Sequence, residues 1–363
     1  MAYRAELIDS KRLWCGHYPC GNTQSPDGTV VVNGGDRRGN ITLISTDKGD
    51  TWEYARNLHV PGMTRLADGT YFAQDFQSVA RFQFNPKVQK KIPYIMKKYR
   101  ADSFDDIMAG NIQIEFECVD IPDLAVGYGD DQDPNHWFAG CAGTGAIQLE
   151  CGDIMLPMYG QFKQDESKLS YFENYDFRQY RTWVLISHDN GHTFEYLSTV
   201  ADCQTYPWNP EAEGFCEPEL LYLGGEHIIC ALRTQGHEVY TPLYISHSYD
   251  SGKTWETPVE INPFGVLPRL LKMQNGAIIC ASGKWDTFFQ ISGDDGVTWS
   301  DRVIVAENDG QWDRGPSGYV SIFETNPNEL LIVYDHTEDR VSDFAPDKDR
   351  RIIYANRYRI VRE

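Results

Sequence analysis

The sequence predicts an all-β fold, a single six-bladed β-propeller that spans residues 1–363. Two repeated patterns carry this prediction. Six times along the chain an apolar run stops at a tight turn and resumes, and four times the frame Ser-x-Asp-x-Gly-x-Thr-aromatic follows. Repeats of this kind indicate a unit of four strands that is arranged radially, as in the blades of a propeller.

Each of the six turns lies between two strand-like segments, which is the signature of a β-hairpin. In chain order the segments are PDGTVVV from Pro26, ADGTYFA from Ala67, ECGDIMLP from Glu150, GGEHIIC from Gly224, QNGAIIC from Gln274 and PNELLIV from Pro327. We expect each hairpin to supply the two inner strands of one blade, so six hairpins predict six blades.

The second pattern is expected to form a turn between the third and fourth strands of a blade. Its copies are STDKGDTW from Ser45, SHDNGHTF from Ser187, SYDSGKTW from Ser248 and SGDDGVTW from Ser292. The Asp side chain can accept hydrogen bonds from the turn amides, and the Gly can adopt a positive φ. The Thr starts an extended segment, and the aromatic residue packs on the sheet. No copy supplies the ligands of a helical-hand calcium loop, so we interpret the frame as a structural clip.

Residues 85–135 interrupt the pattern, because the second blade lacks its clip. This segment contains NPKVQKKIPYIMKKYRADSFDDI, the only basic and partly helical stretch, and we expect it to be an insertion on one rim of the ring. A solvated helix face accounts for its lysines better than a nucleic-acid arm. At the C-terminus, RIIYANRYRIVR is predicted to be an outer strand with AYRAELI paired nearby, which leaves no open sheet edge.

Composition excludes several classes of partner. The formal net charge is −20, and the 53 acidic residues are spread along the chain, which disfavours nucleic acids and anionic membranes. No apolar run has the length of a membrane span, and the N-terminus lacks the apolar region of a signal peptide. The nine cysteines show no zinc-site spacing. We therefore expect a cytoplasmic protein with reduced thiols, no cofactor and no bound metal; the oligomeric state is not predicted.

In a propeller the chain reaches the central funnel just before the first strand of each hairpin and leaves it just after the second. The residues at the first kind of position are His17, His59, His136 (or Trp137), Glu217, Arg269 and Tyr319. The residues just after the second strand of each hairpin are Asp36, Asp75, Tyr159, Arg233, Lys284, and Asp335 with His336. A ring that is only structural needs no such charged and aromatic groups, so we expect the functional site in the funnel.

Six blades with SxDxGxTW clips resemble the sialidase superfamily, in which the clips are called Asp-boxes. The likeness covers nearly the whole chain apart from the insertion. It implies an exo-acting, retaining glycosidase that uses a Tyr nucleophile paired with a Glu. By position, Tyr319 in SGYVS matches the nucleophile, Glu217 in EPELLYL its partner, and Arg233 one arginine of a carboxylate-binding triad. Asp36 matches the acid/base residue, with Asp75 as its rival.

The implied chemistry is coherent. A phenol with a pKa of about 10 is a poor nucleophile at neutral pH, and a carboxylate within reach can take its proton during attack. Asp36 would protonate the leaving oxygen and then deprotonate water.

The sequence also departs from the resemblance. The first triad arginine is replaced by His17 in His17-Tyr18-Pro19, and the strand expected to hold the third carries Gln290. A planar arginine fork is hard to replace for a carboxylate ligand, so we expect a terminal sugar other than ordinary sialic acid. The expected substrate-binding residues are Arg233, Arg269, His17, Arg37, Asp75, His136, Tyr159, Lys284 and His336.

Two other functions stay open. A polysaccharide lyase could use Tyr319 or one of the histidines His17, His59 and His336 to abstract a proton next to a uronate carboxylate. A non-catalytic glycan-binding propeller is the third reading. It needs no phenol–carboxylate couple, so the grouping of Tyr319 with Glu217 favours the glycosidase, with a glycan as the expected partner.

Overall fold

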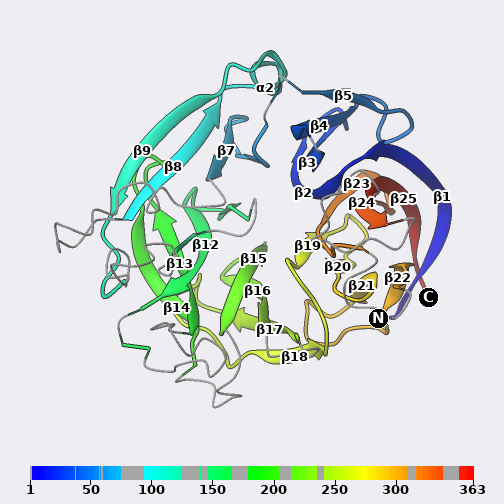
Figure 1. Ribbon diagram of the computed structural model, residues 1–363. Helices are drawn as coiled ribbons and strands as arrows, with labels where there is room; N and C mark the ends of the chain where they lie inside the picture. The colour runs from blue at the N-terminus through cyan, green and yellow to red at the C-terminus, as the bar shows by residue number, and fades with distance from the viewer. Residues whose placement is uncertain are drawn as a thin grey trace, which may run out of the picture. The chain divides into compact units, whose positions relative to one another are not determined.

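The computed structural model describes residues 2–36, 38–56, 58, 60–74, 94–124, 139–140, 145–162, 164–165, 179–203, 214–234, 241–308, 316–337 and 351–363. Within these residues the strands form six antiparallel sheets, most of whose strands are labelled in Figure 1. The fold is an all-β, six-bladed propeller, as predicted. In this part of the chain helix is almost absent, and no helix is long and apolar enough to cross a membrane.

The chain divides into two compact units. The first comprises Met1–Arg65, Asp102–Asn111 and Phe264–Glu363, and the second comprises Leu66–Ala101 and Ile112–Pro263. Three sheets lie in the first unit. Their strands, in sheet order, are β2 (His17–Gln24), β3 (Val30–Asp36), β4 (Gly39–Ser45) and β5 (Glu53–Ala55); β19 (Arg269–Lys272), β20 (Ile278–Ser282), β21 (Thr287–Ser292) and β22 (Val303–Ala306); and β1 (Tyr3–Cys15), β25 (Arg351–Arg362), β24 (Glu329–Thr337) and β23 (Val320–Asn326).

The second unit holds the strands of the other three blades, apart from the short strand β6 (Thr64–Arg65). In sheet order they are β7 (Tyr71–Gln74), β8 (Tyr94–Ala101) and β9 (Gln113–Val119); β10 (Ala139–Gly140), β12 (Ile154–Gln161), β13 (Tyr180–Ser187) and β14 (Glu195–Ala201), with β11 (Ile147–Gln148) also paired to β12; and β15 (Phe215–Gly224), β16 (His227–Thr234), β17 (Leu243–Ser248) and β18 (Val259–Asn262). All six expected hairpins lie between consecutive strands of these sheets.

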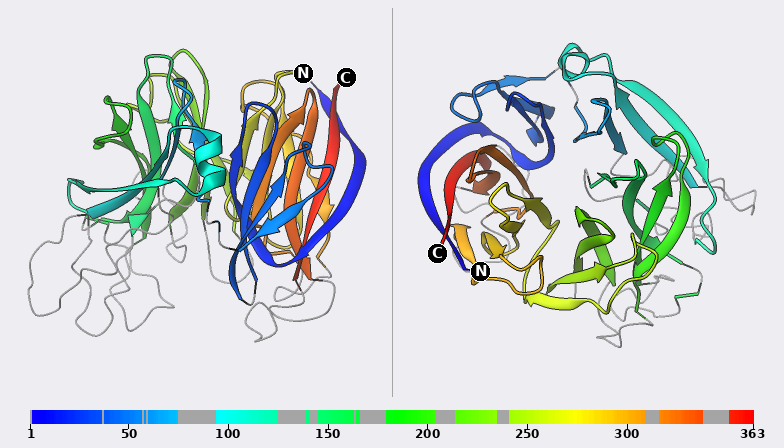
Figure 2. Two further views of the ribbon diagram at one scale, coloured as in Figure 1. Left: turned by 90° about the horizontal axis from the view of Figure 1, so that it is seen from above. Right: turned by 180° about the vertical axis from the view of Figure 1, so that it is seen from behind.

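The last blade is assembled from both ends of the chain. Strand β1 pairs antiparallel with β25, from Tyr3 opposite Arg362 to Cys15 opposite Ile352, and the two strands run side by side in Figures 1 and 2. The predicted pairing of the two terminal segments is therefore confirmed. It makes β1 the outermost strand of a sheet whose other three strands come from the C-terminal end.

Part of the segment 85–135 belongs to the second blade and is not an insertion. Strands β8 and β9 pair from Tyr94–Val119 to Arg100–Gln113, and β8 also pairs with β7. The helix α2 (Phe104–Ala109) connects β8 to β9, where other blades have a clip. The lysines suggested a solvated face, but Lys98 is 2 % exposed and its ammonium lies 3.0 Å from the Glu117 carboxylate. One lysine of this basic stretch is therefore a buried, paired cation.

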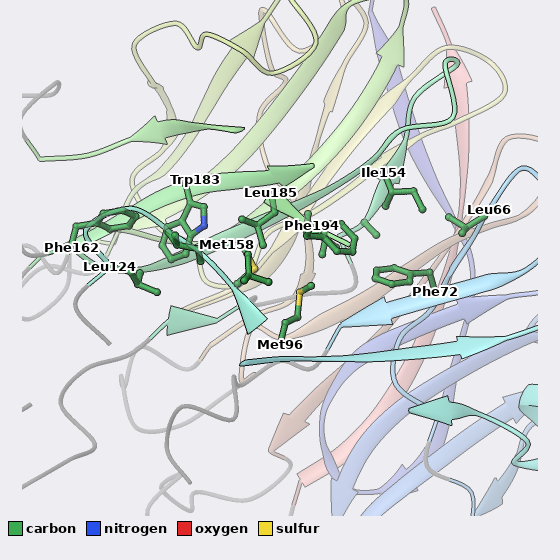
Figure 3. Close-up of a cluster of buried hydrophobic side chains, with 14 residues drawn as sticks. Leu66, Phe72, Met96, Leu124, Ile154, Met158, Phe162, Trp183, Leu185 and Phe194 are labelled. Atoms are coloured by element: carbon green, nitrogen blue, oxygen red, sulfur yellow. The ribbon is translucent and has the colours of Figure 1, made fainter. Parts of the chain in front are cut away.

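Neighbouring sheets pack face to face, so their central strands are apolar on both faces. Figure 3 shows one such core in the second unit, where Phe72, Met96, Met158 and Trp183 meet from four strands. Phe194, the aromatic residue of a clip, lies in the same cluster, with its ring centroid 5.7 Å from that of Phe72. The expectation that the clip aromatic packs against a sheet is thereby met.

Each clip is organised by its Asp carboxylate. In the first clip, Asp47 accepts hydrogen bonds from the Ser45 hydroxyl (2.8 Å), the Thr51 amide (2.8 Å) and the Thr51 hydroxyl (2.5 Å). The Ser45 hydroxyl in turn accepts from the amide of Gly49, which has φ +94°. The same bonds recur in the clips that contain Asp189, Asp250 and Asp294.

The clips also join one blade to the next through their backbone carbonyls. In the first unit, the Arg357 guanidinium donates to the Lys48 carbonyl at 2.9 Å, and the Lys11 ammonium donates to the Asp50 carbonyl at 2.9 Å. In the second unit, Lys98 and Arg100 of β8 donate to carbonyls of the clip that contains Asp189. The clip therefore satisfies its own amides internally and offers its carbonyls to the adjacent sheet.

We expect Asp47→Asn to lower the free energy of unfolding by about 1–2 kcal/mol, as for loss of a capping side chain. In the wild type, hydrogen bonds from the Thr51 hydroxyl and amide lower the pKa of Asp47 to about 2, whereas an unfolded Asp titrates near about 3.9. A folded pKa below the unfolded one means that this stabilisation is complete above about pH 4 and is lost as the pH falls toward 2.

Melting temperatures measured from pH 7 to pH 2 test this expectation. Asp301→Asn, which alters an exposed carboxylate just after the fourth clip, is the control and should match the wild type. If Asp47→Asn loses as much stability in acid as the wild type does, the clip carboxylate is not the titrating group.

Candidate functional site

The second unit brings Glu217 and Arg233 together, although the sequence predicted different partners for them, Tyr319 for Glu217 and the substrate for Arg233. Cys216 and Arg233 are paired in the ladder between β15 and β16, and the register shifts between Cys216 and Glu219. The Arg233 Nε lies 2.8 Å from the Glu217 Oε2, and the two side chains are 11 % and 5 % exposed. Because a buried charge is costly without a partner, this ion pair is what allows Glu217 to stay at the inner end of the hairpin.

Glu217 is also held in an unusual backbone conformation. Its φ is +47°, a value that few residues with a side chain adopt, and Pro218 follows it. The same combination occurs at Tyr18 before Pro19 and at Leu267 before Pro268, with φ of +54° and +40°. Strain of this kind persists where the surrounding structure enforces it, and it concentrates at functional sites.

Tyr159 stands near this pair. It lies on β12, is 8 % exposed, and its ring makes an edge contact with Tyr180 at 5.3 Å between centroids. Burial raises the pKa of Tyr159 well above its usual value, and the charge of Glu217 raises it further. Tyr159 was expected to bind substrate, and the structure gives it the properties of a neutral phenol beside a carboxylate.

The first unit contains the proposed nucleophile, Tyr319, immediately before β23. Its ring meets the ring of Tyr18 edge-on, with 5.1 Å between centroids. The preceding residue, Gly318, has φ +82°, and a Cβ added to Gly283 would lie 2.0 Å from the Gly318 Cα. Two glycines are therefore required for the backbone approach that positions Tyr319.

Tyr18 and Arg351 were missed as candidates from the sequence. Arg351, at the start of β25, forms a buried ion pair with Asp335, with 2.8 Å between Nη1 and Oδ1. Tyr18 is 37 % exposed and lies between Tyr319 and His17. The signal that could have found Tyr18 is the residue-before-proline pattern that it shares with Glu217. Arg351 had no such signal, since it is one of several arginines in RRIIYANRYRIVR.

Asp36, expected to be the acid/base residue, is held as a carboxylate. The Arg56 guanidinium donates to Oδ1 at 3.0 Å and to Oδ2 at 2.5 Å, and the Arg38 amide donates at 2.8 Å. Hydrogen bonding from Arg56 lowers the pKa of Asp36 below its ordinary value. A group with a depressed pKa is a poor proton donor near neutrality, so this arrangement disfavours the predicted role.

Arg269, expected to complete an arginine clamp, serves the main chain instead. It is 1 % exposed, and its guanidinium donates to the carbonyl of Cys20 and, at 3.3 Å, to that of Val320. These bonds connect β19 to strands of two other sheets. The structure therefore assigns Arg269 a role in packing, and the expectation that it binds substrate needs correction.

The other candidates differ in their surroundings. His17 is buried against Gly35, where an added Cβ would lie 3.0 Å from the His17 Nε2. Lys284 has φ +82° and adjoins Gly318, so it stays close to Tyr319. His336 lies within hydrogen-bonding distance, 3.0 Å, of the Glu307 carbonyl. Arg37, Asp75 and His136 lie outside the described residues, as does His59.

Comparison with known proteins agrees with this architecture. Residues 130–266 match the BNR repeat-like domain family. A protein of unknown function from Dyadobacter fermentans has a similar structure, with a TM-score of 0.67, 16 % identity, and coverage of 98 % of this chain and 99 % of that one. The chain has the sialidase-type propeller fold. The predicted resemblance to the sialidase superfamily is thus confirmed at the level of the fold.

Two further solved structures share this fold and have named activities. A Hadza microbial sialidase has a TM-score of 0.57 and 15 % identity, over 94 % of this chain and 65 % of that one. An α-L-arabinofuranosidase from Fusarium graminearum, solved as a mutant with an iminosugar inhibitor, has a TM-score of 0.59 and 14 % identity, over 98 % of both chains. No curated protein sequence matches the chain. The sialidase-type fold is therefore shared with glycosidases of more than one specificity.

Arg233→Met should lower the free energy of unfolding by about 3–5 kcal/mol, because Glu217 is left as an unpaired buried charge. Adding Glu217→Gln should recover part of the loss, so that the double variant is more stable than Arg233→Met alone. Denaturant unfolding measures both values. Arg4→Met breaks an exposed pair with Glu6 and serves as the control, with a change below about 0.5 kcal/mol. Equal losses in the single and double variants would contradict the burial argument.

Proposed function

We propose that this protein is a glycoside hydrolase that removes a terminal non-reducing sugar and retains the anomeric configuration. The observation that carries the proposal is the ion pair of Glu217 and Arg233, buried and placed at a strained backbone position. A propeller needs no charges at the inner end of a hairpin, so these groups are best explained by a ligand. The named activities of the two neighbours with this fold, a sialidase and an arabinofuranosidase, support the same reaction class.

In the proposed reaction, the Tyr319 phenol oxygen attacks the anomeric carbon while a carboxylate takes the phenol proton. The resemblance to sialidases assigns that carboxylate to Glu217. The bond between the anomeric carbon and the leaving oxygen breaks, and a carboxylic acid donates a proton to that oxygen. Water then attacks the glycosyl-tyrosine and loses a proton to the carboxylate that the acid became. The bond between the anomeric carbon and the Tyr319 oxygen breaks, and the phenol takes its proton back from the Glu217 carboxyl.

The proposed substrate is a sugar other than sialic acid. The Arg233 Nε is engaged by Glu217, and the Arg269 guanidinium donates to main-chain carbonyls. Gln290, at the position of a third arginine, donates to the Ser300 carbonyl at 2.9 Å. In this arrangement these three residues do not offer a guanidinium that can donate two parallel hydrogen bonds to a substrate carboxylate. The arabinofuranosidase neighbour supports a neutral terminal sugar.

Hydrolysis of a panel of aryl glycosides tests this proposal, with a sialoside, a uronoside and α-L-arabinofuranosides included. We expect turnover of a neutral terminal glycoside, with the sialoside weak or inactive by comparison. Robust cleavage of the sialoside would overturn the substrate assignment. An unsaturated product that absorbs in the near ultraviolet would indicate a lyase, and binding without turnover of any member would indicate a glycan-binding propeller.

Tyr319→Phe and Glu217→Gln should each lower kcat by about 10²–10⁴-fold, as expected for loss of the nucleophile or of its base. Because the two groups act in one step, the double variant should be little slower than either single variant. Steady-state kinetics on the best substrate of the panel provide the measurement. If Tyr319→Phe keeps near-normal turnover on every accepted substrate, the glycosyl-tyrosine mechanism is wrong.

With Asp36 paired to Arg56, we propose its rival Asp75 as the acid that protonates the leaving oxygen. Asp75→Asn should slow substrates with poor leaving groups far more than activated aryl glycosides, which need little protonation. Asp36→Asn is the matched control and should slow both substrate types equally. A leaving-group dependence in Asp36→Asn, and none in Asp75→Asn, would return the acid/base role to Asp36.

A further inference from the structure

A buried carboxylate in the first unit lies outside the chemistry proposed above. Asp335, near the end of β24, is 1 % exposed and accepts four hydrogen bonds. Its Oδ1 accepts from the Ser317 amide and from Arg351, both at 2.8 Å, and its Oδ2 accepts from the Tyr18 amide at 2.6 Å and the Ser317 hydroxyl at 2.9 Å. Four donors match the four lone pairs of a carboxylate. The orientation of the Asp335 side chain is therefore fixed by these four hydrogen bonds.

These bonds connect the backbones of two tyrosines to one group. The Tyr18 amide donates directly to Asp335. The Tyr319 amide donates to the Ser317 hydroxyl at 3.2 Å, and that hydroxyl donates to Asp335. The two residues whose rings meet edge-on are therefore connected through their backbones to one carboxylate.

Stability alone does not account for this arrangement. A buried ion pair such as Asp335–Arg351 adds little net stability compared with apolar residues of similar volume, whereas it specifies geometry strongly. The geometry that it specifies is also costly, because Tyr18 has φ +54° and keeps 37 % of its surface exposed. Blade packing gains nothing from a strained, partly exposed aromatic residue.

We propose that Asp335 is a positioning residue that holds Tyr18 and Tyr319 as one substrate-facing pair of phenols, in which Tyr18 contacts the sugar that Tyr319 attacks. This inference rests on the proposed function of Tyr319. An aromatic ring edge-on to the nucleophile limits the directions from which the phenol oxygen can approach, and misplacement by about 1 Å can cost about 10²-fold in rate. Arg351 keeps Asp335 paired, with 2.8 Å between Nη1 and Oδ1.

Ser317→Ala is the sharpest test, because it cuts the link to Tyr319 and leaves the Asp335–Arg351 pair and the Tyr18 bond in place. Ser246→Ala is the control, since Ser246 lies in a different blade from Ser317 and also donates one hydroxyl hydrogen bond, to the Glu256 carbonyl. Asp335→Asn tests the carboxylate itself, and Ser317→Thr keeps the hydroxyl.

Two readouts separate positioning from folding and from the proposed function. In protein with labelled tyrosine rings and no substrate, the nuclear Overhauser contact between Tyr18 and Tyr319 should be present in the wild type, Ser317→Thr and Ser246→Ala. It should be lost or weakened in Ser317→Ala and Asp335→Asn. With the best aryl glycoside, Ser317→Ala should lower kcat by about 10–100-fold with KM changed less than about threefold, and Ser317→Thr should restore most of kcat.

The proposal is overturned if the ring contact persists in Ser317→Ala, or if the contact is lost while kcat equals that of Ser246→Ala. If Asp335→Asn does not fold, the three serine variants still decide the question. If no glycoside is turned over by the wild type, the proposed function fails, while the ring contact still tests whether Asp335 positions the pair.

Discussion

The turns between the outer strands of four blades depend on one interaction, the hydrogen bonds that an Asp carboxylate accepts within each clip. A turn between two strands leaves amides and carbonyls without partners, and buried groups of this kind are costly. In each of the four clips the Asp and Ser side chains take up the amides, and the left-handed Gly lets the chain reverse. The carbonyls then point outward, where Lys98 or Arg357 of the adjacent sheet can donate to them. The clip thus joins strands within a blade and connects blades within a unit.

Buried polar groups also need partners at the hairpin ends that hold Tyr18, Glu217 and Asp335. There the backbone is strained, at Tyr18 and Glu217, and the charges are buried. Each charge has a partner on a neighbouring strand: Arg233 for Glu217 and Arg351 for Asp335. Paired charges cost less than isolated ones, but they gain little over apolar packing. Their presence here is better explained by what they position than by what they stabilise.

The corrections at Asp36 and Arg269 have a common cause. Both were expected to face the funnel from their positions beside a hairpin, and both are residue types that suit the expected chemistry. The side chains nevertheless point to protein partners, a guanidinium for Asp36 and two carbonyls for Arg269. Which partner a charged side chain finds depends on residues outside its own hairpin, so its position in the sequence does not fix its role.

The sequence by itself determined what depends on neighbours a few positions apart. Hydrogen bonds of a clip span two to four residues, and hairpins follow from apolar runs around a turn, so six blades, four clips and the positions of Glu217 and Arg233 at the ends of one hairpin could be predicted. Only the tertiary structure decided that Arg56 holds Asp36, that Arg269 reaches a carbonyl 249 residues away, and that Asp335 binds an amide 317 residues away. Such contacts have no local signature, because they arise when sheets formed from distant segments pack together.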